Sequence, residues 1–179
     1  MRHLTRRRFI ETGVGGLVLL SLANCGGAAK APAGSFDDSG YTYRFLTAAN
    51  RSMIAAVGGA MLAGALPADS AAHGVALVQV VRGVDVAAAG LPPGVQAEIG
   101  QLFGLLDFPV TRALAAGVWH SWSGASSADV SAFLTRWRFS GIVLFRSGYQ
   151  ALHQLVMASW YGNSTSWAAI GYPGPPVLG

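Results

Sequence analysis

The chain has 179 residues, of which 52% are hydrophobic and only 11% are charged, and its formal net charge is +4. Four arginines and one glutamate lie before residue 25, so the rest of the chain carries eight basic and seven acidic residues, close to +1. This balance excludes the basic stripe that a nucleic-acid-binding domain needs. A charged fraction below half the usual share of about 25% predicts large exposed apolar patches, which mark contacts with a partner or a membrane.

Residues 1–25 have the plan of an export signal. A basic head precedes the moderately apolar run Gly13–Ala23, which is too short for a membrane span of about 20 residues. Arg6, Arg7 and Phe9 fit the twin-arginine pattern, in which paired arginines precede an aromatic and an aliphatic residue. A basic N-terminal arm and an ordinary secretory signal are the alternatives. We expect twin-arginine export, the route that carries folded proteins.

The only cysteine, Cys25, ends the apolar run in the order Leu-Ala-Asn-Cys. This order is similar to the lipoprotein processing box, except that Asn24 stands where a small residue is usual. Cys25 is therefore either an acylated anchor, which would tether the domain to a membrane, or a residue removed with the signal. In both cases a lone cysteine excludes an internal disulfide and a cysteine-based metal site within one chain.

Composition changes again after the signal. Residues 26–44 are rich in Ala, Gly, Ser and Pro and predict a flexible spacer. Residues 45–179 have the length of one domain with one core. Hydrophobic periodicity predicts a compact all-α domain of about five or six helices without internal repeats.

The first predicted helix begins after Thr47, a good N-cap, and ends near Ala65 before Pro67. Alanine and glycine recur along it at four-residue spacing, so we expect another helix to approach closely. The alternative is a membrane span, but the uncharged run Ser52–Ala68 is short and weakly hydrophobic. A tightly packed helix of a soluble domain is the favoured interpretation.

Caps and breakers set the next boundaries. Asp69 or Ser70 can cap a helix that continues to Ala89, although the β-branched run Val75–Val86 leaves a strand possible. Gly90–Gly94 is a strong break. Further helices are predicted at residues 95–107 and, after Pro109, at residues 110–118. Residues 121–127 are predicted to form a loop, and a helix from Ser126 or Ser127 through Trp137 follows it.

The longest predicted helix lies between Ser140 and Gly162. Gly162-Asn163 is expected to stop it, because Gly or Asn adopts the left-handed conformation that ends helices. Ser164 or Thr165 is then expected to cap one short turn. The tail Gly171–Pro176 holds three prolines and therefore forms neither helix nor central strand. The apolar face of the long helix recurs in steps of four and three residues: Phe145, Tyr149, Leu152, Val156 and Trp160.

The C-terminal runs Tyr149–Val156, Trp160–Asn163 and Trp167–Pro176, with Leu46–Ala49 and Pro67–Asp69 nearer the start, resemble a family of small twin-arginine-exported subunits. The chain is similar to the gamma subunit of membrane-bound FAD-dependent glucose dehydrogenases and to subunit 3 of gluconate 2-dehydrogenase. Residues 71–123 carry none of this resemblance.

The resemblance implies a non-catalytic accessory subunit in the periplasm, at the cytoplasmic membrane through its complex or a lipid anchor. Its partner would be a large FAD-dependent dehydrogenase of the glucose–methanol–choline (GMC) kind, with the FAD in that partner. This chain would stabilise the flavoprotein and take it, already folded, through the twin-arginine translocase. A multihaem cytochrome c could accept the electrons.

Aromatic residues near the C-terminus are our candidates for contacts with that partner. Stacking of a sugar or a quinone on the tryptophans is the alternative, but helix packing and partner contact explain them more simply. The predicted contact residues are Tyr149, His153, Trp160, Tyr161, Trp167, Tyr172 and Pro173.

The sequence offers little reactive chemistry. His120 and Ser121 with Asp107 or Asp129 would make a triad on paper, yet no glycine elbow surrounds Ser121. His73, His120 and His153 lack a ligand spacing, and no dinucleotide-binding glycine motif follows a strand. We therefore expect no catalytic, metal or cofactor site in this chain. The alternatives are a free-standing exported lipoprotein or scaffold that binds apolar ligands or the envelope, and a small enzyme that uses the His120 region.

Overall fold

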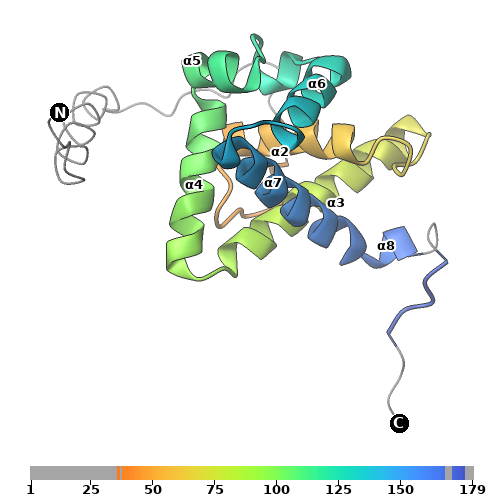
Figure 1. The fold of residues 1–179 in the computed structure, drawn as a ribbon. Coiled ribbons are helices and arrows are strands. Elements are labelled where there is room, and N and C mark those ends of the chain that lie inside the picture. The colour runs from red at the N-terminus through yellow and green to blue at the C-terminus, as the bar shows by residue number, and fades with distance from the viewer. Residues whose placement is uncertain (1–35, 37, 168–170, 176–179) are drawn as a thin grey trace, which may run out of the picture. The chain divides into compact units, whose positions relative to one another are not determined.

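The computed structural model describes residues 36, 38–167 and 171–175 (Figure 1). Within these residues every regular element is helical and no strand forms, so the prediction of an all-α domain is confirmed. The strand alternative for Val75–Val86 is wrong, because these residues lie inside a continuous helix. The predicted export signal, with Arg6, Arg7 and Phe9, and the lipidation candidate Cys25 lie outside the described residues.

Helix α2 (Ala48–Met61) begins where its capping residue predicts. The Thr47 hydroxyl accepts from the Asn50 N–H, and the Asn50 side chain accepts from the Thr47 N–H, which together form a capping box. Gly58 faces α3, where a Cβ would be in van der Waals contact with Val80 at 3.4 Å. The helix stops at Met61 rather than near Ala65, and a turn carries the chain to the next cap.

Helices α3 (Ser70–Ala89) and α4 (Pro93–Asp107) follow, with Asp69 capping the first and Pro at the start of the second. The helix predicted at residues 110–118 is shorter and less regular. It consists of α5 (Pro109–Thr111) and a π-helical turn, η2 (Arg112–Ala116). Gly117 ends this turn with a φ of +63°, a conformation that favours glycine.

The last helices are α6 (Ser127–Arg138), α7 (Val143–Tyr161) and α8 (Ser164–Trp167), with the short 3₁₀ turn η3 (Trp122–Gly124) before α6. The Ser126 side chain caps α6. Helix α7 ends at Gly162 as predicted, but not through a left-handed residue, because Gly162 has a φ of −70°. The right-handed turn leads directly into α8, whose Ser166 N–H donates to the Asn163 carbonyl.

The core lies where α7 crosses the other long helices, and α3 is its most extensive neighbour (Figure 1). Two glycines permit this approach. A Cβ at Gly83 of α3 would lie 2.8 Å from the Cβ of Ser159, and one at Gly148 of α7 would lie 2.5 Å from the Trp137 ring. The largest fully buried side chains come from α2, α3, α4, α6 and α7: Met53, Ile54, Val80, Val84, Phe103, Leu106, Phe133 and Leu152.

The segment from Tyr41 to Leu46, which we call the strap, is attached to α3. The buried carboxylate of Asp85 accepts from three consecutive backbone N–H groups, those of Arg44, Phe45 and Leu46, at 2.8–3.0 Å. Before the strap, Asp38 pairs with Arg82 at 2.6 Å. The last described residues of the predicted spacer therefore have ionic and hydrogen-bond partners on α3.

Candidate partner-binding surface

Three of the predicted contact residues gather beyond the C-terminal end of α7. The Trp167 indole N–H donates to the Tyr161 carbonyl at 2.8 Å, and the rings of Trp167 and Tyr172 meet edge to face with centroids 5.2 Å apart. We call Tyr161, Trp167 and Tyr172 the aromatic cluster. Tyr161 is 51% exposed and Tyr172 is 44% exposed. The hydrogen bond joins the Trp167 ring to the backbone of Tyr161, and the ring contact joins Trp167 to Tyr172. Exposed aromatic side chains held in this way are typical of surfaces that bind other proteins.

The tail that follows is shaped by glycine. Gly171 and Gly174 adopt φ values of +68° and +103°, and a Cβ at Gly174 would lie 3.2 Å from the Trp167 ring. The Tyr172 N–H donates to the Trp167 carbonyl at 2.9 Å. The chain thus folds back on Trp167 and leaves Pro173 exposed next to the cluster.

The other predicted contact residues lie elsewhere. Trp160 is only 6% exposed and belongs to the hydrophobic core, so its ring packs within the described fold at the end of α7. Tyr149 and His153 are half-buried, one turn apart in the middle of α7, with ring centroids 5.7 Å apart. Sequence periodicity could not make this distinction, because Tyr149 and Trp160 share one apolar stripe.

The end of α7 is also fixed to α3 and α8. The Asn163 side-chain amide donates to the Gln79 side chain of α3. The Ser166 hydroxyl donates to the Trp160 carbonyl at 2.7 Å. These bonds hold the aromatic cluster at a defined place on the helical body, which favours binding with little loss of conformational entropy.

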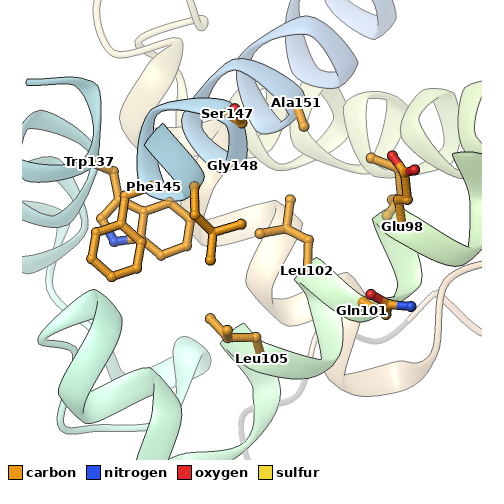
Figure 2. A pocket seen from close by; sticks show the side chains of 11 residues that line it. Glu98, Gln101, Leu102, Leu105, Trp137, Phe145, Ser147, Gly148 and Ala151 are labelled. Carbon is orange, nitrogen blue, oxygen red and sulfur yellow. The ribbon is translucent and has the colours of Figure 1, made fainter. Parts of the chain in front are cut away.

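A second apolar feature is a groove of about 410 Å³ between α4 and α7 (Figure 2). Leu102 and Leu105 of α4 form one side. The Trp137 and Phe145 rings, stacked with centroids 5.1 Å apart, lie at the end opposite Glu98. The volume falls within the usual range for small-molecule sites, about 300–1,000 Å³.

The residues considered for a triad do not assemble. The Ser121 hydroxyl is 3.1 Å from that of Ser123, the Asp129 carboxylate accepts from Ser126 at 2.7 Å, and Asp107 accepts from Asn50. Among the described residues, no cluster of three or more His, Cys, Asp or Glu side chains is placed to hold a metal ion.

Two carboxylates have environments that the sequence does not reveal. Asp85 is fully buried and holds the strap; its signal in the sequence is that it is the one acidic residue of α3, three positions after Arg82. Asp107 ends α4, and burial raises its pKa to about 6, although the Asn50 hydrogen bond and Arg112 act in the opposite direction. In the described part of the chain its Oδ1 is buried without a hydrogen-bond partner.

Within the described ranges, α3 is the one helix whose length and composition would suit a membrane crossing, with a mean hydropathy of 1.2 over its most apolar window. A core helix of a soluble protein can meet the same criteria, and α3 packs against both α7 and α2. The alternative of a membrane span was raised for α2, which does not meet these criteria.

The chain matches no protein-family model, no curated protein and no solved structure.

Proposed function

We propose that this chain is a non-catalytic small subunit that binds and stabilises a large flavin-dependent dehydrogenase of the GMC type and accompanies it through the twin-arginine translocase to the periplasm. The observation that carries the proposal is the aromatic cluster. The motif behind the family resemblance, from Trp160 to Pro176, includes the residues that form an exposed and hydrogen-bonded surface at the end of α7. The FAD is expected in the partner, and a multihaem cytochrome c would receive the electrons.

The physical logic has two parts. A domain with few charges and several half-exposed large aromatic side chains gains free energy when a partner covers them. The cluster is already ordered by the Trp167–Tyr161 hydrogen bond and by the glycine turns of the tail, so little ordering remains to oppose binding.

Affinity purification of the tagged full chain from its own host tests the proposal. We expect a flavoprotein, recognised by its visible absorption spectrum, to be recovered in a constant ratio to this chain. Changing Tyr161→Ser and Tyr172→Ser together should lower its recovery at least tenfold, the equivalent of about 1.4 kcal/mol. The matched control is Val75→Ser with Val86→Ser, two exposed apolar residues of α3 that are 58% and 60% exposed.

A second arm addresses export. Replacing Arg6 and Arg7 with Lys should retain both this chain and the flavoprotein in the cytoplasm, because the partner depends on this signal. Recovery of the chain without a flavoprotein, or a flavin bound by this chain alone, would contradict the proposal.

The α4–α7 groove favours one second candidate, an exported scaffold or lipoprotein that binds apolar ligands. It predicts that the purified chain, free of partners, is monodisperse and binds an apolar fluorescent probe such as an anthroyloxy fatty acid. Ser147→Leu would narrow the groove and weaken that binding, since the exposed Ser147 lines it. The Tyr161 and Tyr172 changes would leave probe binding intact.

A further inference from the structure

Four large apolar side chains are exposed at the turn between α6 and α7, which we call the corner. Phe139 is 74% exposed, Leu144 is 68%, Val143 is 66% and Ile142 is 56%. They are consecutive in the chain apart from Ser140 and Gly141. The corner lies at the opposite end of α7 from the aromatic cluster, and a helix of 19 residues is about 28 Å long. The two surfaces can therefore be covered at the same time by different partners.

The charges that α6 and α7 themselves bring to the corner are positive. Arg138 and Arg146 flank it, both exposed, and residues 130–179 contain no Asp or Glu. The Arg138 guanidinium lies 5.2 Å from the centre of the Phe139 ring, beside the apolar side chains. The packed helix α4 contributes one carboxylate, that of Glu98, which lines the same groove as Leu144 at the end opposite Phe145 (Figure 2).

The backbone of the corner is largely satisfied from within. The N–H groups of Phe139 and Ser140 donate to carbonyls of α6 at 3.1 and 3.3 Å, and the Ile142 N–H donates to the Ser140 hydroxyl at 3.1 Å. The Ser140 carbonyl accepts from Arg146 at 2.5 Å. These bonds lower the cost of moving the turn out of water, while the first N–H groups of α7 remain available to an acceptor outside the chain.

The start of α7 supports the same interpretation. The N-cap of α7 is Ile142, which provides no side-chain hydrogen bond, as is also true of Pro92 at the start of α4, whereas α2, α3 and α6 have polar capping residues. The first N–H groups of a helix attract anions. Lipid phosphates lie at the depth that such groups would reach when the neighbouring apolar side chains enter the hydrocarbon.

We propose that the corner is a membrane-contact surface, in which Phe139, Ile142, Val143 and Leu144 enter the interface of an anionic bilayer while Arg138 and Arg146 bind the lipid phosphates. The chemistry matches that of interfacial membrane-binding elements, which combine an apolar face with Lys or Arg. A protein partner of similar affinity would normally offer carboxylates to the two arginines and meet Tyr or Trp, whereas the four exposed side chains of the corner are Phe, Ile, Val and Leu, with Tyr149 beside them at 6.0 Å from the Arg138 guanidinium. The proposal does not depend on the flavoprotein.

A local probe tests it in the full chain, where the export signal is itself expected to bind lipid. In a Cys25→Ser background, Val143→Cys carries an environment-sensitive NBD label, and Val75→Cys provides the matched control on α3. The control valine is 58% exposed against 66% for Val143. Each protein is titrated with phosphatidylcholine vesicles that either contain phosphatidylglycerol or lack it.

We expect a blue shift of the label at residue 143 with anionic vesicles, its quenching by brominated acyl chains, and no shift at residue 75. Arg138→Gln with Arg146→Gln should weaken this partitioning roughly fivefold per arginine, the equivalent of about 1 kcal/mol per charge. Glutamine at residue 146 can still donate to the Ser140 carbonyl, so the turn is preserved.

Three results would overturn the proposal. The first is vesicle binding of the chain without a shift at residue 143, which would assign the binding to the export signal. The second is an equal shift at both labelled positions. The third is a label at residue 143 that is already in an apolar environment before lipid is added, which would show that a second copy or a protein partner covers the corner.

Discussion

The strap and the corner both contain large apolar side chains, but the strap is attached to the core and the corner is exposed to solvent. In the strap, three consecutive backbone N–H groups share one buried carboxylate, and Leu46 is buried in the core. At the corner, the hydrogen bonds are local and four large apolar side chains face solvent. A chain with only 11% charged residues places one of its few carboxylates where it holds a segment in place. It leaves apolar surface where an external partner can cover it, so the strap stabilises the fold and the corner is available for contact.

The largest test of this comparison removes the carboxylate of the strap. Asp85→Ala leaves the N–H groups of Arg44, Phe45 and Leu46 without their acceptor, and we expect a loss of about 3 kcal/mol or more in the free energy of unfolding. Urea unfolding measures the loss, and hydrogen exchange at residues 44–46 should accelerate with it. Glu98→Ala is the control, because Glu98 is exposed and its removal should change the stability by less than about 0.5 kcal/mol. Similar losses in the two variants would show that the strap does not depend on this carboxylate.

The second test asks whether α6 and α7 are closely packed beneath the exposed side chains of the corner. A Cβ at Gly148 would lie 2.5 Å from the Trp137 ring, and that ring is 2% exposed and stacked on Phe145. Because the ring has no space to move into, Gly148→Ala should destabilise the fold by about 2 kcal/mol. Gly104→Ala is the matched control. It lies in a helix with no atom near its Cβ position, so it should gain up to about 1 kcal/mol from helix propensity. A stabilising Gly148→Ala would mean that α7 and Trp137 are not closely packed.

Much of the fold could be predicted because the residues that start its helices act over only a few positions in the sequence. Thr47, Asp69 and Ser126 cap helices through bonds to residues three positions later, and Pro93 stands at the first position of α4. Such signals need only a short window of sequence. The carboxylate that holds the strap could not be identified in this way, since Asp85 and its partners are 39 to 41 residues apart.

The candidate surface was predicted only in part. Periodicity placed Tyr149 and Trp160 on one stripe, but only the packing of α8 and α3 buries Trp160 and leaves Tyr161 exposed. The corner was not predicted at all. Val143 and Leu144 continue the apolar pattern of α7, and an apolar run gives no indication that the fold turns it towards solvent.

The third test concerns the partly buried carboxyl of Asp107. Among the described residues, its Oδ1 has no hydrogen-bond partner, unlike either oxygen of Asp85. Burial raises the folded pKa of Asp107 from 3.8 to about 6, so the folded state binds a proton more tightly than the unfolded state. The carboxyl therefore favours folding below about pH 4, and this contribution is lost as the pH rises towards 6. Asp107→Asn should remove this pH dependence of the free energy of unfolding. Between pH 4 and pH 7 the stability of the variant relative to the wild type should therefore rise by about 1 kcal/mol, after solvent screening is allowed for. Unfolding by urea at several pH values gives the difference. A difference that is constant with pH would mean that Asp107 titrates normally.

The smallest expected change in the free energy of unfolding is for substitutions at the corner itself, in contrast to the large loss expected for the strap. Ile142→Ser with Val143→Ser replaces side chains that are 56% and 66% exposed, so little apolar area returns to water and the free energy of unfolding should change by less than about 0.5 kcal/mol. Leu152→Ser on the same helix is the counterpart. This leucine is fully buried, and the change should cost at least about 3 kcal/mol. A large loss in the double variant would show that the corner belongs to the core of the fold. An unchanged stability together with weaker binding to anionic vesicles would mean that the corner side chains are exposed for contact, because selection for folding alone gives no reason to keep four large apolar residues in water.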